Sequence, residues 1–367
     1  MSARKKILHI TQAMGGVKTY LTHVFNYADH DQYEFVIIAP KDEAFEAFCA
    51  SKGIRYYCIN LQRSIAPVAD LKGLFRIASL IRKEKPHVIH THSAKGGFLG
   101  RLATKFAKSK VIYTPHGFSY MSFTGVKRVL FYSLEILAQR WTNLLLAVSY
   151  SEGNRAIFEI GFKPAKVKVI LNAIPIPFKP RTVMGIPDLH IGMIGRLTYQ
   201  KNPLLFLELA KTLLEKFPGL KFSMLGAGLH DHLSKEITAY LEKHELTSRV
   251  AFINWGEDGT SERFLNSIDV FLMTSVFEGL PFSLLEAMGV GLPCVVSKVD
   301  GNTDVIQNNE NGYACLSKEE FIEKLTFLVQ DQHLRTVTGK AARRYVAAHH
   351  NIEKTIKELE GIYDNLI

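Results

Sequence analysis

The sequence predicts an α/β protein with two doubly wound, Rossmann-like domains, and three observations predict this fold class. The chain has 367 residues, which is enough for two hydrophobic cores. Short apolar runs alternate with helical patterns in both halves, which is typical of βαβ units in a mostly parallel sheet. Between the halves, Pro175, Pro177 and Pro180 disfavour a helix and indicate an extended linker.

Twelve apolar runs are the predicted strands. Seven lie in the first half, at 6–12, 34–40, 55–61, 87–93, 110–115, 144–149 and 166–173. Five lie in the second half, at 189–194, 221–225, 249–253, 269–274 and 293–297. Because open α/β sheets bind ligands beyond the carboxyl ends of their strands, we expect the functional residues in the loops that follow these runs.

Three parts follow from the positions of the strands and the prolines. Residues 1–174 are predicted to be an N-terminal Rossmann-like domain and residues 175–345 a C-terminal one. Residues 340–367 have the pattern of one or two terminal helices. We expect 346–367 to be a C-terminal helix able to pack back on the N-terminal domain.

The positive charge is concentrated in the first half. The net charge is +10; residues 1–175 hold 25 Lys and Arg against 11 Asp and Glu, a balance of +14, which leaves 20 against 24 in the remainder. This asymmetry indicates an anionic partner for the first half, either a nucleic acid, an anionic membrane surface or a phosphorylated acceptor. A basic face that is merely solvated is the alternative.

Composition and the amino terminus predict a cytoplasmic protein that can be peripheral on a membrane. No run of 18 uncharged apolar residues is present, and the apolar run after the basic start is too short for a signal peptide. The four cysteines lack the C-x2-C spacing of a metal site, so we expect reduced, buried thiols. Residues 118–141 combine many aromatic side chains with Lys127, Arg128 and Arg140, which favours either core packing or contact with lipid headgroups.

In the first half, polar and glycine residues follow three predicted strands. Gly15 and Gly16 come between a strand and a helix, where the backbone can approach a ligand closely and the helix start favours negative charge. The run H-T-H-S-A-K-G-G ends the strand at 87–93, and T-P-H-G ends the next one. We expect His116, which a glycine follows, to face a ligand; a structural histidine is the alternative.

In the second half, two segments offer groups that suit a nucleotide sugar. Arg196 and Lys201 lie five positions apart where a strand gives way to a helix, so both can converge on one diphosphate. Glu278 and Glu286 lie eight positions apart in a loop and the following helix. Carboxylates can accept from sugar and ribose hydroxyls, while the N–H groups of the intervening loop can bind phosphate.

These two segments resemble the signature regions of family 4 glycosyltransferases, which have the two-Rossmann-domain GT-B fold with a central cleft. Glu278 and Glu286 match the family's Glu-x7-Glu motif, and Gly15-Gly16 and T-P-H-G look like its N-terminal elements. The run H-T-H-S-A-K-G-G-F-L-G-R-L followed by T-P-H-G-F is similar to bacterial enzymes of capsular, exopolysaccharide or O-antigen biosynthesis that act on polyprenyl-diphosphate lipids.

The resemblance implies an acceptor-binding N-terminal domain and a donor-binding C-terminal domain. It assigns the donor diphosphate to Arg196 and Lys201, the ribose hydroxyls to Glu286, and the hydroxyls of the transferred sugar to Glu278. His116 would face the reacting sugar. The remaining contacts would come from the loop backbone and the N-terminal glycines, that is Gly279, Leu280, Pro281, Phe282, Gly15 and Gly16. Residues 254–256 resemble the place where the family packs the nucleobase, and Lys18 stands where many relatives have Glu.

The resemblance also implies a reaction with retention of the anomeric configuration and without a metal or other cofactor. The expected function is transfer of a hexose or N-acetylhexosamine from a UDP-sugar to a lipid-linked or phosphorylated saccharide, on the inner face of the membrane. A nucleotide-sugar 2-epimerase of the same fold is one alternative. A non-catalytic basic module that binds nucleic acid or anionic lipid is another. The complete donor motif in an acidic half argues against the module, so no nucleic acid is expected as partner.

Overall fold

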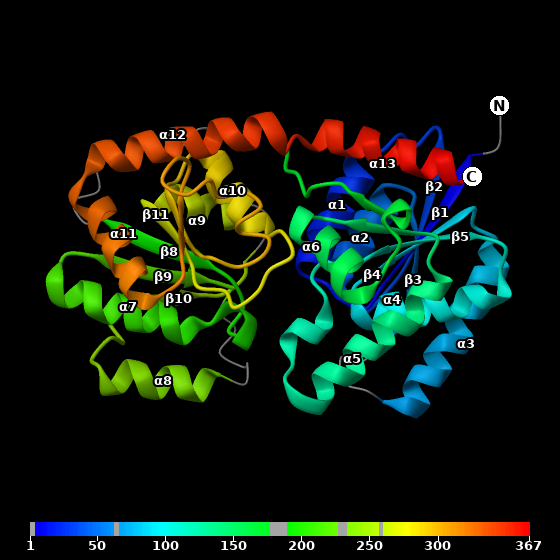
Figure 1. Ribbon diagram of the computed structural model, residues 1–367, viewed down its shortest axis with the longest axis horizontal. Coiled ribbons are helices and arrows are strands. Elements are labelled where there is room, and N and C mark those ends of the chain that lie inside the picture. The colour runs from blue at the N-terminus through cyan, green and yellow to red at the C-terminus, as the bar shows by residue number, and fades with distance from the viewer. Residues whose placement is uncertain (1–3, 62–65, 177–188, 227–232, 257–259) are drawn as a thin grey trace. The chain divides into compact units, whose positions relative to one another are not determined.

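The chain folds into two compact units in the computed structural model (Figure 1). One unit is Met1–Asn172 with Ile352–Ile367, and the other is Ala173–Asn351. The structure describes residues 4–61, 66–176, 189–226, 233–256 and 260–367, so the part of the predicted linker beyond residue 176 lies outside the described residues. Each unit is built on a separate parallel sheet with helices around it.

The N-terminal unit contains a seven-stranded sheet in the order β3-β2-β1-β4-β5-β6-β7, and all its strand pairs are parallel. Its strands are β1 (Lys5–Thr11), β2 (Tyr33–Ala39), β3 (Arg55–Cys58), β4 (Val88–His92), β5 (Lys110–Thr114), β6 (Leu144–Ala147) and β7 (Val167–Val169). Its longer helices are α1 (Gly16–Tyr27), α2 (Glu43–Ser51), α3 (Pro67–Glu84), α4 (Ala94–Ala103), α5 (Gly125–Ala138), α6 (Tyr150–Arg155) and α13 (Ile352–Leu366).

The C-terminal unit contains a six-stranded sheet in the order β10-β9-β8-β11-β12-β13, which is also parallel throughout. Its strands are β8 (His190–Ile194), β9 (Lys221–Leu225), β10 (Val250–Ile253), β11 (Val270–Met273), β12 (Cys294–Ser297) and β13 (Tyr313–Cys315). Its helices are α7 (Pro203–Lys216), α8 (Ser234–Lys243), α9 (Thr260–Ser267), α10 (Phe282–Val290), α11 (Lys318–Gln330) and α12 (Gln332–His349).

The twelve predicted strands are confirmed, with ends that differ by a few residues. The thirteenth strand, β13, is absent from the prediction. It has only three residues and pairs with β12 alone, so it is too short to produce a recognisable period in the sequence.

The predicted boundary at 345/346 is wrong, because α12 continues through His349. The chain then passes His350 and Asn351, and α13 begins at Ile352 and belongs to the N-terminal unit. Figure 1 shows α13 beside α1, and hydrogen bonds join α13 to β1 and to the loop after α1. Glu360 Oε1 accepts from the Asp29 backbone N–H at 2.7 Å, and Lys5 Nζ lies 2.8 Å from Asp364.

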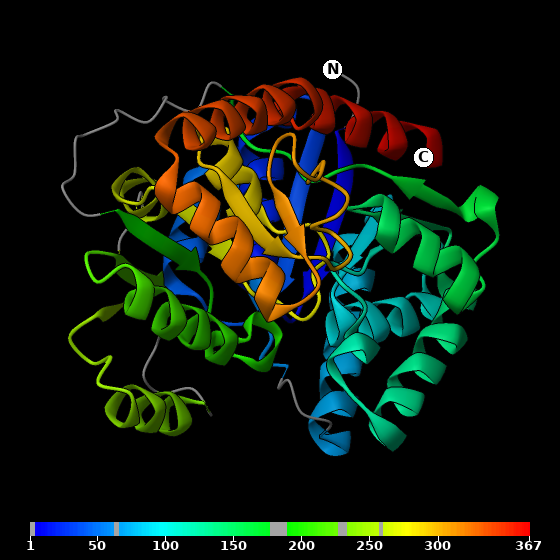
Figure 2. The same cartoon turned by 60° about the vertical axis from the view of Figure 1, so that its left-hand side comes forward.

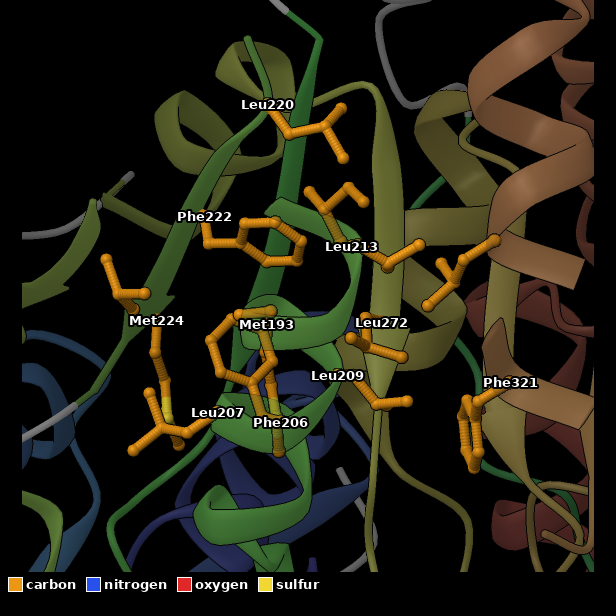
Figure 3. Close-up of a cluster of buried hydrophobic side chains, with 14 of the residues drawn as sticks. Met193, Phe206, Leu207, Leu209, Leu213, Leu220, Phe222, Met224, Leu272 and Phe321 are labelled. Carbon is orange, nitrogen blue, oxygen red and sulfur yellow. The ribbon is translucent and has the colours of Figure 1, made fainter. Parts of the chain in front are cut away.

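The core of the C-terminal unit shows why α7 forms and where it packs (Figure 3). Phe206, Leu209 and Leu213 recur at helical spacing and are fully buried on one face of α7. They pack against side chains from neighbouring strands, such as Phe222 of β9 and Leu272 of β11. Asn202 caps this helix and has a left-handed backbone with φ 48°, and its side chain accepts from the Leu205 N–H.

Strand order creates one switch point in each sheet. In the N-terminal unit the chain adds β2 and β3 on one side of β1 and begins the other side with β4. In the C-terminal unit the same change occurs between β8 and β11. Loops that follow strands at such a point diverge to opposite faces of the sheet and leave a crevice where ligands bind. The loops after β1, β4, β8 and β11 therefore border these crevices.

The aromatic residues of the segment 118–141 are buried or half-buried, and the exposed apolar side chains of this segment are aliphatic. Phe118 and Tyr120 are buried in the core, whereas α5 exposes several aliphatic side chains, and Val126 is 86% exposed. α5 is held by a buried group: Glu135 accepts from Arg101 and Tyr113, each at 2.8 Å, and the Arg101 guanidinium stacks on the Tyr113 ring.

The four cysteines are unpaired; Cys49, Cys294 and Cys315 are buried and Cys58 is half-buried. Within the described part of the chain, no helix combines the length and hydropathy needed to cross a bilayer.

Candidate active site

The predicted donor residues follow β8 and β11, the two strands at the switch point of the C-terminal sheet. The ladder between these strands has two pairs, Val270 with Ile191 and Phe271 with Gly192, although both strands continue further. The loops 195–202 and 274–281 therefore leave the sheet side by side at its carboxyl edge.

Hydrogen bonds join these two loops directly. Thr274 is buried, and its Oγ1 donates to the backbone carbonyls of Lys201 at 3.0 Å and Asn202 at 2.9 Å. The Val276 N–H donates to the carbonyl of Gln200 at 2.8 Å. The loop that carries Lys201 is thus fixed on the loop that carries Glu278. Sequence reasoning did not assign a role to Thr274 or Gln200, since only the fold brings their partners near.

Lys201 and Glu278, both predicted site residues, form an ion pair. Lys201 Nζ lies 2.5 Å from Glu278 Oε1, and the two side chains are 17% and 6% exposed. Gln200 Nε2 donates to the other carboxylate oxygen at 3.3 Å. A buried pair of this kind keeps both charges satisfied, and each partner would be costly to leave without the other.

Glu286, the second carboxylate of the motif, lies in the middle of α10. Burial raises the pKa of its carboxyl group to about 7. Helix α10 begins at Phe282 after Pro281, without a side-chain cap. Its first-turn N–H groups therefore point to the carboxyl edge of the sheet, the arrangement that favours a phosphate. Leu280, Pro281 and Phe282 have buried side chains, so they can contribute to binding through their backbone.

Arg196 and Trp255 lie at the surface of the same unit. Arg196 is the second residue after β8 and is exposed. Trp255 follows β10 and is 53% exposed, and a Cβ atom on Gly226 would lie 2.8 Å from its indole Nε1. The indole therefore packs against the backbone of the loop after β9. A half-exposed aromatic ring at this edge is suited to stacking with a planar ligand group.

Gly301 packs on the loop of Glu278, a role that the sequence alone did not assign to it. Its φ is 77°, and a Cβ atom there would lie 2.5 Å from the carbonyl oxygen of Gly279. Only glycine allows both this conformation and this approach. The signal in the sequence was a single glycine between polar residues after β12, which is too common to be diagnostic.

Gly301→Ala is expected to lower the free energy of unfolding by about 2 kcal/mol or more, because it adds both backbone strain and a clash. It should also raise KM for the donor, since the loop of Glu278 must move. Thermal unfolding and initial rates measure the two effects. Gly361→Ala is the matched control: a Cβ there meets nothing within 4 Å, so the substitution in α13 should stabilise. Wild-type stability and KM in Gly301→Ala would contradict the assignment.

In the N-terminal unit, two pairs of glycines have different functions in the fold. Gly15 has φ 75° and precedes α1, and a Cβ atom on Gly15 or Gly16 would meet nothing within 4 Å. Their open surface permits the close approach of a ligand. Gly96 and Gly97, by contrast, allow α4 to pack tightly: a Cβ on Gly96 would lie 2.7 Å from the backbone nitrogen of Gln12, and one on Gly97 would lie 2.4 Å from the Tyr113 ring.

His116 follows β5 with a left-handed backbone, φ 55°, which is uncommon outside glycine. Its Nε2 lies 3.0 Å from Nδ1 of His92, at the end of the neighbouring strand β4. Burial lowers the pKa of His116 to about 3, so its ring is neutral at physiological pH. The turn is fixed by Glu152, which accepts from the Gly117 N–H at 2.6 Å and from the Val148 N–H at 2.8 Å.

Lys18 pairs with Asp42, with Nζ 2.9 Å from both carboxylate oxygens, and lies over the Phe45 ring. A substrate phosphate would have to compete with this carboxylate.

Comparison with known proteins agrees with the geometry. Residues 15–173 match the model described as "Glycosyl transferase 4-like domain", and residues 186–345 match "Glycosyl transferases group 1". A protein of Escherichia coli named UDP-Gal:alpha-D-GlcNAc-diphosphoundecaprenol alpha-1,3-galactosyltransferase is 29% identical, over 99% of this chain and 97% of its own. The capsular polysaccharide biosynthesis glycosyltransferase CapM of Staphylococcus aureus is 25% identical over 85% of each chain.

Two solved structures show the same fold. HepE of Anabaena, in complex with UDP and glucose, has a TM-score of 0.83 with 18% identity over 98% of this chain and all of its own. Sucrose-phosphate synthase of Thermosynechococcus elongatus has a TM-score of 0.84 with 14% identity over 99% of each chain. The two matched family models divide the chain as the two units do, and the Glu-x7-Glu residues lie at the switch point of the second. The chain therefore belongs to the family 4 glycosyltransferases and has the GT-B fold.

Proposed function

We propose that this enzyme transfers a hexose or an N-acetylhexosamine from a UDP-sugar to a saccharide on a polyprenyl diphosphate, for a surface polysaccharide. One observation carries the proposal: Lys201 and Glu278 pair beside the start of α10. A single point then offers a cation and N–H groups for a diphosphate, and a carboxylate for sugar hydroxyls. The name of the E. coli relative, which matches nearly the whole chain, supports both substrate classes and makes galactose the first sugar to test.

Donor binding would exchange one set of partners for another. The diphosphate would accept hydrogen bonds from Lys201, Arg196 and the first turn of α10, while sugar hydroxyls would donate to Glu278 and ribose hydroxyls to Glu286. Neither member of the Lys201–Glu278 pair is then left buried without a partner, which keeps the cost of separating them small. The two cations also neutralise the charge that grows on the leaving diphosphate, so no divalent metal is required.

The reaction would proceed on one face of the sugar, with retention of the configuration at the anomeric carbon. The bond from the anomeric carbon to the diphosphate oxygen breaks, and a bond to the acceptor hydroxyl oxygen forms on the same face. The acceptor proton passes to the leaving diphosphate, so no protein nucleophile takes part. His116, Gly15 and Gly16 of the N-terminal unit would contact the sugar and the acceptor. Their role would be to position these two substrates and to exclude water from the reacting atoms.

A polyprenyl acceptor lies in a membrane, so the enzyme must bind at the membrane surface to reach it. Helices α3 and α5 would provide a protein surface with apolar and basic residues for this binding. Both views show these helices next to each other in the N-terminal unit (Figures 1 and 2). We define the α3–α5 patch by its exposed aliphatic and aromatic side chains, Val68, Leu71, Phe75, Val126, Val129 and Leu130. Exposed basic residues lie among them, namely Lys72, Arg76, Lys127 and Arg128. Apolar residues framed by cations suit an anionic bilayer, and this would place the enzyme on the cytoplasmic face.

The triple variant Val126→Ser, Val129→Ser, Leu130→Ser is expected to weaken binding to vesicles of phosphatidylcholine with phosphatidylglycerol by about tenfold or more. Sedimentation with these vesicles measures the fraction of enzyme that is bound. Leu316→Ser is the control, because Leu316 is 71% exposed but belongs to the C-terminal unit. Equal binding of the triple variant and wild type would remove the α3–α5 patch from the proposal.

The function itself is tested by product mass. The enzyme is incubated with UDP-galactose, UDP-glucose or UDP-N-acetylglucosamine, and with a synthetic polyprenyl-diphosphate N-acetylglucosamine. We expect the acceptor to gain the mass of one sugar residue, without added metal and in the presence of a chelator. Interconversion of the donor without transfer would favour the 2-epimerase, and stabilisation by oligonucleotides alone would favour the binding module.

A further inference from the structure

Four histidines of the N-terminal unit form a cluster, and His116 is the one among them to which the proposed function gives a substrate contact. His9 of β1, His90 and His92 of β4 are fully buried, and His116 follows β5. The three strands are neighbours in the sheet. Three of the rings are linked in a row: His9 Nδ1 lies 3.0 Å from His92 Nε2, and His92 Nδ1 lies 3.0 Å from His116 Nε2. We call His9–His92–His116 the imidazole chain.

His90 lies beside the imidazole chain but outside it. Its Nδ1 is 2.9 Å from the hydroxyl of Tyr363, and its Nε2 is 2.8 Å from Oγ1 of Thr114. Its ring packs on that of His92 with 4.2 Å between centroids. The nitrogens of His9, His90 and His92 are close enough to hold a metal ion. However, both nitrogens of His90 and of His92 already take part in hydrogen bonds, so a metal would have to break them.

The rings of the imidazole chain are neutral. Burial lowers the pKa of His9 and of His116 to about 3 and takes that of His92 well below its usual value. A neutral imidazole has one N–H donor and one acceptor nitrogen. Each link needs one donor and one acceptor, so the N–H groups of the row must all point in the same direction.

The end of the row decides that direction. Nε2 of His9 is buried and has no hydrogen-bond partner among the described residues. A buried N–H without an acceptor is rarer in proteins than an acceptor without a donor. The proton of His9 therefore lies on Nδ1 and is donated to His92 Nε2. His92 in turn donates its Nδ1–H to His116 Nε2, which leaves the proton of His116 on Nδ1.

We propose that His92, oriented by His9, is a positioning residue that fixes His116 in the Nδ1–H tautomer, so that His116 donates a hydrogen bond to an oxygen of the bound sugar. In water a neutral imidazole favours the Nε2–H form, so the fold would impose the less common one. His116 then cannot serve as a base through Nδ1. The inference rests on the proposed function for its ligand, but the tautomer is a property of the protein alone.

The tautomer is measured on the full-length protein by NMR of ring-15N histidine, with His116→Gln to assign the signals. We expect a protonated Nδ1 and an unprotonated Nε2 on His116. The opposite pattern would overturn the inference whatever the enzyme transfers. Transition metal bound in stoichiometric amount to these rings in the purified protein would overturn it too. If His116 had the Nδ1–H tautomer but the enzyme transferred no sugar, the proposed function would be contradicted and the inference about the tautomer would stand.

Two substitutions of His92 separate positioning from packing. In His92→Asn the amide NH2 takes the place of Nδ1–H, whereas His92→Leu removes the donor. We expect His92→Leu to move His116 to Nε2–H and to lower kcat by about tenfold or more, and His92→Asn to keep both near wild type. His90→Gln, which alters the same buried cluster outside the row, should leave the His116 tautomer unchanged. Retention of Nδ1–H in His92→Leu would contradict the role of His92.

Discussion

Lys201→Ala is expected to lower kcat by about 100-fold or more, because it removes a cation from the developing charge of the leaving diphosphate. It should also lower the free energy of unfolding by about 3 kcal/mol, since it leaves Glu278, which is 6% exposed, without its ion-pair partner. Steady-state kinetics and chemical denaturation measure the two effects separately.

Two further variants accompany this prediction: Arg196→Ala tests the second cation of the donor site, and Lys211→Ala is the control for loss of a positive charge. Arg196 is exposed, so its loss should reduce kcat to a similar extent with little change in stability. Lys211 pairs with Glu215 on the exposed side of α7, 2.7 Å apart, and its replacement makes the same change of charge close by in the chain. Lys211→Ala should leave both quantities almost unchanged. Near-normal turnover in both Lys201→Ala and Arg196→Ala would refute the donor site.

The double variant Lys201→Met, Glu278→Gln separates catalysis from folding. It replaces both members of the buried pair, so no buried charge remains, and we expect most of the lost stability to return. Activity should stay absent, because neither the diphosphate nor the sugar hydroxyls find their partner. Recovery of turnover in the double variant would show that the single variants failed through instability alone.

Affinity for the donor is expected to fall about tenfold between pH 8 and pH 6, and Glu286 is the cause. Burial raises the pKa of its carboxyl group to about 7, so this group is mostly ionised at pH 8 and mostly protonated at pH 6. Ribose hydroxyls need the ionised form as acceptor. Calorimetric titration with UDP-galactose, whose diphosphate has no group that titrates in this range, measures the change.

Glu286→Gln should weaken donor binding at pH 8 and abolish its dependence on pH. The same substitution should stabilise the protein. A carboxyl group whose pKa is raised by folding contributes fully below its unfolded pKa and loses that contribution as the pH rises through the folded pKa of about 7. At pH 8 the gain from Gln is therefore up to about 3 kcal/mol, and near pH 4.5 it should be small. Equal stability of both proteins at pH 8, or an unchanged pH dependence of binding in Glu286→Gln, would contradict the assignment.

The sequence pattern was sufficient to predict those strands and helices whose formation depends on residues close together in the chain. The strands β1 to β12 follow from apolar runs, and the helices between them from apolar spacing, because both depend on which side chains a short segment must bury. The pairing of Lys201 with Glu278 was expected only in part: the sequence predicts that both lie near a nucleotide sugar, but they are 77 residues apart and their salt bridge depends on β8 lying next to β11.

The sequence by itself determined the two Rossmann-like sheets and the family, and it predicted the residues of the donor motif. Only the tertiary structure decided that Thr274 joins the two donor loops, that Gly301 supports the loop of Glu278, and that His9, His92 and His116 form a row. The physical reason is strand order. Periodicity records which face of a segment is buried, but it does not record which strand lies beside it, and these contacts exist only between neighbours in the sheet.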